Sequence, residues 1–284
     1  MNVVLCVVAK HENIYINEWC RYYLNLGFSH IYIYDNNEPD YPDVADAIDV
    51  SIKDKISIIR YTPNDTFLNA MQVNAFQNFY DTYGQTFDWC AFFDIDEFLV
   101  GIDNVNEFLA KNRFKNTQQI KILWRLYGDG EMITRDLSKS VHESFKDTEP
   151  VKEIKNSFTY NYYHNWIDCC KCFLAGKQDN IKIANVHFAT TTDDKPLKTK
   201  FPNGEICICQ NFCNFPSNLY HSDVFINHYI TKTISEFLDY KYLGLPVFTD
   251  KPTKVNLNYF WAFNTKTPEK EAYIAEYLKN KNIV

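Results

Sequence analysis

Two aspartates separated by one residue interrupt an apolar stretch of the chain. Asp94-Ile95-Asp96 follows the run Trp89–Phe93, and apolar residues resume at Phe98. Carboxylates in a buried strand are costly unless positive charge compensates, and a divalent cation with oxygen ligands is the usual partner. In extended geometry Asp94 and Asp96 share one face while Ile95 faces the core. The motif predicts a Mg²⁺ or Mn²⁺ site with positions open to diphosphate oxygens. Taken in isolation, however, so short a motif more often marks acids that cap a turn or pair with a lysine.

The elements around this motif alternate between strand and helix. Val3–Ala9 is a β-branched run typical of a strand covered on both faces, residues 12–26 carry apolar side chains at helical spacing, and Gly27 suits the end of that helix. Further predicted elements are a strand at His30–Tyr34, a strand at Ile56–Arg60, a helix capped by Asp65 and a strand at Ile120–Trp124. We predict an α/β fold, an open mixed sheet that is mostly parallel in its N-terminal half and flanked by helices. Ligands bind such sheets at strand ends, where the acidic motif lies.

The second half of the chain shows weaker periodicity. Strands are predicted at Ile181–Phe188 and Glu205–Cys209, and helices at Thr233–Leu243 and from Thr267-Pro268-Glu269, where proline suits the first helical position. No linker separates the halves. We therefore expect one domain over residues 1–284, with a ligand-binding half at 1–130 and a second half at 131–284.

Composition excludes several classes of protein. The net charge of −7 argues against a protein that binds nucleic acid by charge. No stretch approaches the roughly 18 apolar residues that span a bilayer, and the start lacks a basic leader, so we expect a cytoplasmic protein. Only eight glycines occur, and they cannot form either of the common glycine-rich phosphate-binding motifs. Dinucleotide oxidoreductases and P-loop enzymes are thereby excluded.

The nine cysteines are an odd number, and several lie in apolar runs, which is typical of reduced thiols. Two clusters, Cys169-Cys170-x-Cys172 and Cys207-x-Cys209-x-x-x-Cys213, leave a zinc site open. Cys169 and Cys172 have C-x-x-C spacing, but the second cluster offers no such pair to complete a site, so the less specific interpretation, buried thiols, is favoured.

Several blocks of sequence, taken in order, resemble one family of enzymes. They are Val7-Val8-Ala9-Lys10-His11-Glu12, His30-Ile31-Tyr32-Ile33-Tyr34-Asp35-Asn36-Asn37, the segment 89–99 around Asp94-Ile95-Asp96-Glu97-Phe98, Trp124-Arg125-Leu126-Tyr127-Gly128, and Asn227-His228-Tyr229-Ile230-Thr231-Lys232 with Glu236-Phe237. This set resembles the GT-A glycosyltransferases, and more narrowly their family-2-like and family-92 group. The resemblance implies a GT-A-like fold and a nucleotide-sugar donor.

The resemblance also implies where the donor binds. A metal on Asp94 and Asp96 would bridge the donor diphosphate and stabilise the charge that develops as the nucleotide leaves. His228 is the expected third ligand, and His187 is its alternative. Donor-binding positions are expected at the ends of the first two strands, beside the acidic motif and at two lysines: Ala9, Lys10, Glu12, Asp35, Asn36, Asp94, Ile95, Lys171 and Lys232. Ordinary turn chemistry and solvated lysines are the alternatives for these positions.

An inverting transferase needs a base that accepts the proton of the acceptor hydroxyl. Asp129 and Glu131, on a glycine-containing loop after a predicted strand, are the candidates, and a solvated acidic turn is the alternative. Inversion itself is implied only by the resemblance.

The leading hypothesis is a metal-dependent hexosyltransferase that uses UDP-galactose or UDP-glucose and a saccharide or glycolipid acceptor in surface polysaccharide or lipooligosaccharide biosynthesis. Such a role is compatible with peripheral association at the inner face of a membrane and requires no nucleic acid. Two alternatives stay open: an inactive sugar- or nucleotide-binding module, and a metal-dependent nucleotidyl or phosphoryl transferase, which the order of the motifs disfavours.

Overall fold

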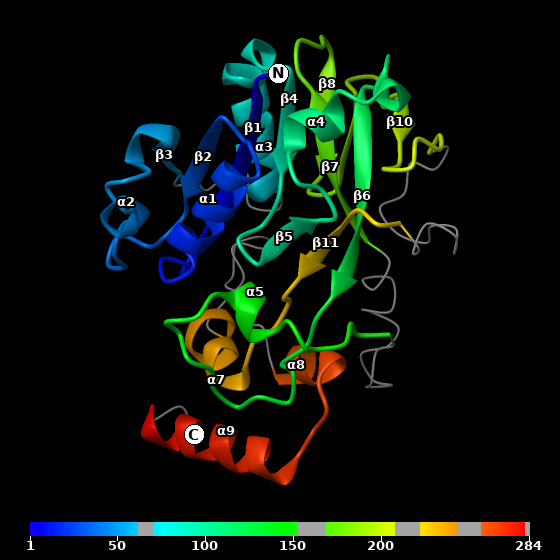
Figure 1. Cartoon of the computed structure of the whole chain (residues 1–284). Coiled ribbons are helices and arrows are strands. Elements are labelled where there is room, and N and C mark those ends of the chain that lie inside the picture. Colours follow the sequence, from blue (N-terminus) through cyan, green and yellow to red (C-terminus); the bar gives the residue numbers. More distant parts are fainter. Residues whose placement is uncertain (62–70, 153–168, 208–221, 243–256, 282–284) are drawn as a thin grey trace. The chain divides into compact units, whose positions relative to one another are not determined.

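The computed structural model describes residues 1–61, 71–152, 169–207, 222–242 and 257–281 (Figure 1). The predicted α/β class is confirmed, since helices flank a large mixed sheet that is consistent with a GT-A-like fold. Over the described residues, the strands are β1 (Val3–Ala9), β2 (His30–Asp35), β3 (Ile56–Arg60), β4 (Trp89–Phe92), β5 (Glu97–Val100), β6 (Gln119–Leu126), β7 (Cys170–Ala175), β8 (Ile181–Asn185), β9 (Phe188–Thr191), β10 (Thr199–Lys200) and β11 (Phe225–His228). The α-helices are α1 (Ile16–Asn25), α2 (Val44–Ala47), α3 (Met71–Thr82), α4 (Val105–Leu109), α5 (Val141–Ser144), α7 (Ile234–Glu236), α8 (Leu257–Phe263) and α9 (Pro268–Asn280).

The main sheet follows the order β3-β2-β1-β4-β7-β6-β11-β5, and β10 pairs with β6. The four strands β3, β2, β1 and β4 run parallel, as predicted for the N-terminal half. Strand β7 breaks this pattern, because it is antiparallel to both β4 and β6. Strand β7 was not predicted, because its cysteines were considered as buried thiols or zinc ligands and Lys171 as a donor-binding residue, and the segment was not considered as a strand. Its central place puts Lys171 beside the end of β4.

Helices cover both faces of the parallel part of the sheet. On one face, α3 packs Ala75, Phe76 and Phe79 against alternate residues of β1, β4 and β7. On the other face, α1 buries Trp19, which the helical spacing predicts, and Tyr23, which takes the buried position expected for Tyr22. Gly27 follows the end of α1 and has φ +100°, a conformation that favours glycine. The two helices thus hold in place the part of the sheet where β1, β2 and β4 end.

The second half departs from prediction in two places. The strand predicted at Ile181–Phe188 is a hairpin of β8 and β9, because Asn185 turns the chain by accepting hydrogen bonds from the backbone N–H groups of His187 and Phe188. Residues 205–207 form only an isolated bridge, and Cys209 and Cys213 lie outside the described residues, as do Asp65 and residues 243–256.

The helix predicted from Thr233 is confirmed at its start, where Thr233 and Glu236 form a reciprocal capping box, but it continues as a π-helical stretch, η6 (Phe237–Lys241). The last helix begins at Pro268 as predicted, with Thr267 as its cap. The described residues also contain short turns of 3₁₀ helix, namely η1 (Lys53–Lys55), η2 (Gly84–Thr86) and η3 (Asn112–Phe114).

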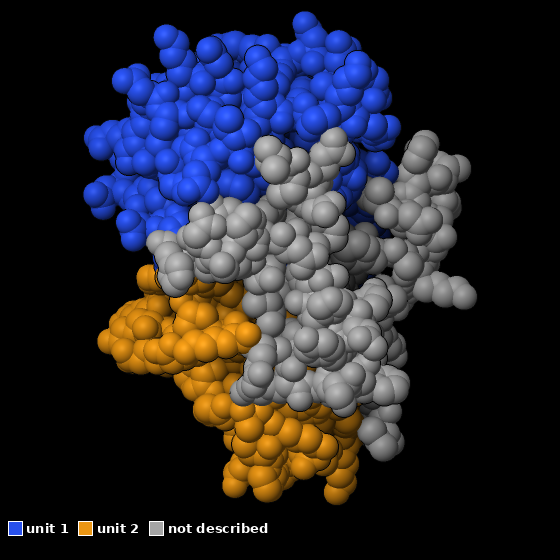
Figure 2. All heavy atoms as spheres, turned by 90° about the vertical axis from the view of Figure 1, so that its right-hand side faces the viewer, with its two compact units in different colours: residues 1–124, 168–227, 246–251 blue, residues 125–167, 228–245, 252–284 orange. Residues whose placement is uncertain are grey.

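The chain clusters into two compact units, coloured separately in Figure 2. Unit 1 comprises residues 1–124, 168–227 and 246–251, and unit 2 comprises residues 125–167, 228–245 and 252–284. The units therefore do not follow the sequence halves, because the chain enters and leaves unit 2 more than once. The expectation of one domain over 1–284 stays a prediction. Across the part of the chain that is described, no helix is long and apolar enough to cross a membrane.

Candidate functional site

The acidic motif forms a turn between β4 and β5 in unit 1. The backbone N–H of Glu97 donates to the carbonyl of Asp94 at 3.0 Å, and the Glu97 carboxylate accepts the N–H of Asp94 at 2.9 Å. The extended geometry predicted for Asp94 and Asp96 is therefore wrong, because a reciprocal pair of hydrogen bonds closes the segment on itself. The predicted location at the end of a parallel strand is confirmed.

Two aromatic residues of α1 form hydrogen bonds with the backbone of this turn and of the strand that follows it. The Trp19 indole N–H donates to the carbonyls of Asp94 at 2.9 Å and Glu97 at 3.1 Å. The Tyr23 hydroxyl donates to the Glu97 carbonyl at 2.9 Å and accepts the N–H of Leu99 at 3.1 Å. Both side chains are fully buried. Sequence reasoning placed Trp19 in the core by its spacing and missed that its polar atom fixes the turn.

The Asp94 carboxylate is held by two side chains and is still 30% exposed. Lys171 Nζ lies 2.7 Å from one oxygen, and Gln72 Nε2 donates to the other at 2.6 Å. Lys171 is completely buried and also lies 3.7 Å from Glu97 Oε2. The structure thus brings Lys171 to the acidic motif, but as the lysine partner that the alternative interpretation required. Gln72 was missed, since nothing in its spacing separates it from other polar residues of a helix.

Burial and charge act in opposite directions on the ionisable groups beneath the turn. Burial alone lowers the pKa of Lys171, but the carboxylates of Asp94 and Glu97 together raise it above its ordinary value. Burial raises the pKa of Glu97 well above its ordinary value, and the Lys171 charge only partly opposes this shift. Lys171 is therefore a fixed cation, and the protonated form of Glu97 is favoured compared with an exposed glutamate.

The turn offers two carboxylates of the type that hard cations prefer. Asp94 is partly exposed and Asp96 is 4% exposed. Among the described residues, no group of three or more His, Cys, Asp and Glu side chains has the arrangement of a metal site. Mg²⁺ commonly binds through one or two carboxylates together with substrate phosphates and water. The carboxylates of Asp94 and Asp96 are the ligand type that such a shared site uses, and their joint binding of one ion together with donor phosphates stays a prediction.

The ends of β1 and β2 bring other predicted residues together. Lys10 Nζ and His11 Nε2 both contact the Glu38 carboxylate, at 2.7 Å and 2.5 Å. Burial opposes ionisation of Glu38, but the hydrogen bonds from Lys10 and His11 lower its pKa to about 2. Ala9 lies in register with Asp35, and the Ala9 carbonyl accepts the backbone N–H of the next residue, Asn36, at 2.9 Å.

Asp35 organises the loop that follows β2. It is 2% exposed, and its carboxylate accepts the N–H groups of Asn37 and Val44 at 3.0 Å each. Arg60 Nη1 lies 3.1 Å from it. Asn36 is also buried, and its side chain donates to the Tyr61 carbonyl at 3.0 Å. The turn chemistry named as the alternative for these residues is present, and their donor-binding role, with that of Glu12, stays a prediction.

The predicted bases lie on a loop of unit 2. Asp129 is 2% exposed and lies 2.6 Å from Lys270 Nζ, while the Glu131 side chain is 63% exposed and lies 3.2 Å from the same nitrogen. Burial raises the pKa of Asp129, and Lys270 partly opposes this shift. Lys270 was missed by sequence reasoning, because it follows this loop by about 140 residues.

Other predicted residues are placed as follows. His228 ends β11 and is 6% exposed, and Lys232 is 3% exposed with φ +53°, in the left-handed region. His187 Nδ1 lies 2.8 Å from the carbonyl of Cys170. Burial raises the pKa of the Cys170 thiol, which favours the neutral form and is typical of a structural cysteine. The metal-ligand and phosphate-binding roles of His228 and Lys232 stay predictions.

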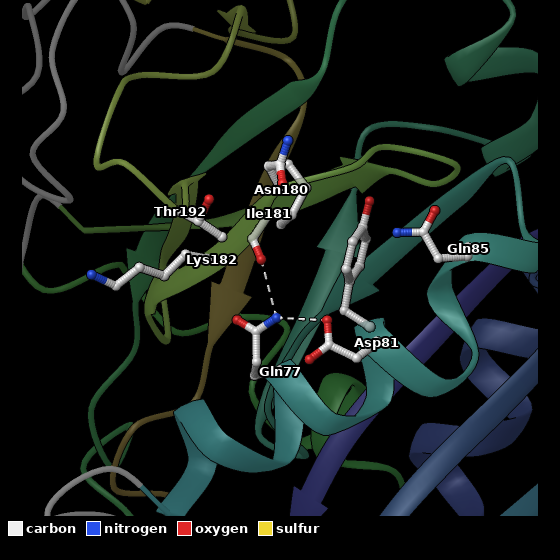
Figure 3. A pocket seen from close by; sticks show the side chains of 8 residues that line it. Gln77, Asp81, Gln85, Asn180, Ile181, Lys182 and Thr192 are labelled. Atoms are coloured by element: carbon white, nitrogen blue, oxygen red, sulfur yellow. Dashed lines mark hydrogen bonds between the residues drawn. The ribbon is translucent and has the colours of Figure 1, made fainter.

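A polar hollow of about 360 Å³ lies elsewhere in unit 1, between the end of α3 and the hairpin of β8 and β9 (Figure 3). Gln77 donates there to Asp81 at 2.9 Å and to the Ile181 carbonyl at 3.1 Å. The neighbouring Tyr80 hydroxyl donates to Ala175, whose register partner is Trp89 at the start of β4. The hollow is thus at the start of β4, whereas the acidic turn follows its end. Its hydrogen bonds tie α3 to the hairpin.

One family of known proteins matches most of the sequence of this chain. The profile of glycosyltransferase family 92 matches residues 2–239, which include the acidic turn and the loop of Asp129. This chain belongs to glycosyltransferase family 92. A search of curated proteins finds no match. Glycosyltransferase activity, with a sugar donor and an acceptor, is thereby supported at the level of the family.

Proposed function

We propose that this glycosyltransferase is a metal-dependent hexosyltransferase, with UDP-galactose or UDP-glucose as donor and a saccharide or glycolipid as acceptor. The observation that carries the proposal is the acidic turn, in which Asp94 presents a partly exposed carboxylate at the end of β4. In this proposal Asp94 and Asp96 hold Mn²⁺ or Mg²⁺. The bound ion would supply positive charge to the diphosphate of the donor.

Lys171 supports this role from inside the protein. Its side chain is completely buried beside Asp94, so we do not assign it a direct contact with the phosphates, and that role, which the resemblance implies, stays a prediction. Its charge instead compensates part of the negative charge of Asp94 and Glu97, which lowers the cost of gathering acids in one turn. Three further contacts hold Asp94: Gln72 donates to its other carboxylate oxygen, Trp19 donates to its carbonyl, and the Glu97 carboxylate accepts its N–H. Asp94 is therefore oriented before any ligand binds.

The reaction we propose is displacement at C1 of the sugar. The acceptor oxygen forms a bond to C1, the bond from C1 to the diphosphate breaks, and the hydroxyl proton passes to a carboxylate of the loop at 129–131. Inversion, the hexose, and a place in surface polysaccharide or lipooligosaccharide biosynthesis at the cytoplasmic face of a membrane are part of this proposal. They rest on the resemblance of the motifs.

Donor hydrolysis tests the proposal without knowledge of the acceptor. We expect purified protein with Mn²⁺ to release free hexose and UDP slowly from UDP-galactose or UDP-glucose, and EDTA to abolish the release. An inactive binding module would release nothing. A nucleotidyl or phosphoryl transferase would yield UMP or pyrophosphate instead. Full hydrolysis in EDTA would contradict the metal-dependent mechanism.

A further inference from the structure

The C-terminal helix α9 contacts the acidic loop of unit 2 through the buried side chain of Lys270. Lys270 is 2% exposed, and its Nζ lies 2.6 Å from Asp129 Oδ2 and 3.2 Å from Glu131 Oε2. It also donates to the carbonyl of Thr265 at 3.1 Å. Lys270 lies beyond residue 239, where the match to family 92 ends. The loop is therefore held by a segment for which the family match does not account.

A second anchor comes from the end of α8. Asn264 Oδ1 accepts the N–H of Asp129 at 2.5 Å, and its Nδ2 donates to the Phe260 carbonyl at 2.8 Å and to Thr231 Oγ1 at 3.1 Å. A Cβ atom at Gly128 would collide with Asn264 Oδ1, so glycine permits this close approach. Backbone and side-chain contacts thus hold the same loop from two sides.

These contacts give the two acids of the loop different surroundings. Asp129 is buried, with Oδ1 accepting the N–H of Glu131 at 3.0 Å and Oδ2 facing Lys270. The Glu131 side chain is 63% exposed, and its backbone has φ +61°, which is uncommon for a residue other than glycine. Such a backbone persists where surrounding contacts determine it. Asp129 is therefore occupied in holding the loop, whereas Glu131 presents its carboxylate to solvent.

We propose that Lys270 is a positioning residue that fixes this loop so that Glu131, and not Asp129, accepts the proton of the attacking hydroxyl. The inference rests on the proposed function and narrows it to one base. Lys270 does not contact the reacting atoms. It neutralises Asp129 and orients the Glu131 carboxylate, on which the efficiency of proton transfer depends.

The test compares four variants in hydrolysis of UDP-galactose and UDP-glucose with Mn²⁺, where water replaces the acceptor: Glu131→Gln, Lys270→Met, Lys270→Arg, and the double variant Asp129→Asn with Lys270→Met. We expect kcat to fall about 100-fold in Glu131→Gln, within the range for loss of a general base. Lys270→Met should lower kcat at least about 10-fold with KM nearly unchanged, and Lys270→Arg should recover part of it, because the positive charge is retained.

The double variant separates positioning from stability. It removes both buried charges, so its Tm should recover relative to Lys270→Met, because no uncompensated carboxylate is left inside. Its kcat should stay low, because Glu131 still lacks its partner. Recovery of kcat together with Tm would overturn the inference, since Lys270 would then only stabilise the fold.

Crystal structures of wild type and Lys270→Met give a readout that does not depend on activity. We expect residues 128–131 to shift and Glu131 to leave its left-handed conformation in the variant. An unchanged loop would overturn the positioning role even if the enzyme is active. If wild type hydrolyses neither donor while the loop shifts as expected, the proposed function and the assignment of Glu131 as base fail, but the structural role of Lys270 is supported.

Discussion

The acidic turn of unit 1 and the acidic loop of unit 2 both place carboxylates around one buried lysine, but they expose those carboxylates to different extents. At the turn, Lys171 faces Asp94 and Glu97, with Asp96 beside them. At the loop, Lys270 lies within an ion-pair distance of Asp129 and Glu131. Because burial favours the protonated form of Glu97, the two regions carry similar net charge. They differ in exposure, which is 30% for the Asp94 side chain and 63% for the Glu131 side chain.

The two regions also differ in how they are anchored. Aromatic donors on α1 hold the backbone of the turn, whereas the side-chain amide of Asn264 and the Lys270 ammonium hold the loop. The turn is formed by residues 19, 72, 94–97 and 171, all within the segment matched by family 92, while the loop depends on residues beyond it.

The largest effect is expected from removing the fixed cation at the turn. Lys171→Met leaves Asp94 and Glu97 without their buried partner, and breaking a buried pair costs about 3–5 kcal/mol. We expect the free energy of unfolding in urea to fall by about that amount. Gln72→Ala is the matched control, because it removes a neutral partner of the same carboxylate and should cost clearly less. Equal losses would show that charge compensation is not what Lys171 provides.

Removing either aspartate should break the function of the turn in a chain that still folds, although Asp94→Asn should also lower the free energy of unfolding, because the buried Lys171 loses the charge it faces. Asp94→Asn or Asp96→Asn should lower donor turnover at least about 100-fold, or about 2.7 kcal/mol, the order of loss for a group that stabilises developing charge. Hydrolysis rates measured beside circular dichroism check both parts. Wild-type rates in both variants would contradict the assignment.

The anchoring of the turn can be weakened without touching a charge. Trp19→Phe removes one donor from the carbonyls of Asp94 and Glu97, which are left with poorer hydrogen bonding, at a cost of about 1–3 kcal/mol. We expect a lower urea midpoint and weaker Mn²⁺ binding by calorimetry. Trp261→Phe, on α8 in unit 2, is the control and should leave Mn²⁺ binding unchanged. Unaltered Mn²⁺ affinity in Trp19→Phe would show that this anchor is unrelated to the site.

The smallest effect is expected at the ends of β1 and β2. The pKa of Glu38 is lowered from 4.5 to about 2 in the folded protein. Between these values the unfolded chain binds more protons, so stability due to Glu38 is present above about pH 4.5 and is lost as the pH falls toward 2. The Tm difference between wild type and Glu38→Gln should therefore shrink as the pH falls from 6 to about 3. A difference independent of pH would contradict the ion pairs with Lys10 and His11.

How much could be predicted from the sequence depended on the distance along the chain over which each interaction acts. Strands such as Val3–Ala9 and Ile56–Arg60 agree residue for residue, because a continuous β-branched run between turn signals determines them locally. The acidic motif was found, but its turn was not, since the turn depends on Trp19 and Lys171, which lie more than 70 residues away. Lys270 was missed for the same reason.

The strand β7 shows a second cause of error. Its alternation places Cys170 and Cys172 on one face and Lys171 on the other, which is a strand pattern. The cysteines and Lys171 were interpreted one at a time, as thiols or metal ligands and as a donor-binding residue, so the periodicity was not recognised. A buried lysine in an apolar run is itself an indication that a carboxylate lies opposite.

The central claim is that Asp94 and Asp96 hold one divalent cation that binds the diphosphate of the donor. The most direct measurement is the Tm of wild type and of the Asp94→Asn, Asp96→Asn double variant with UDP, in Mn²⁺ and in EDTA, because a ligand that binds only the native state raises Tm. We expect UDP to raise the Tm of wild type in Mn²⁺ alone and to leave the variant unchanged. An equal rise in EDTA, or in the variant, would contradict the claim.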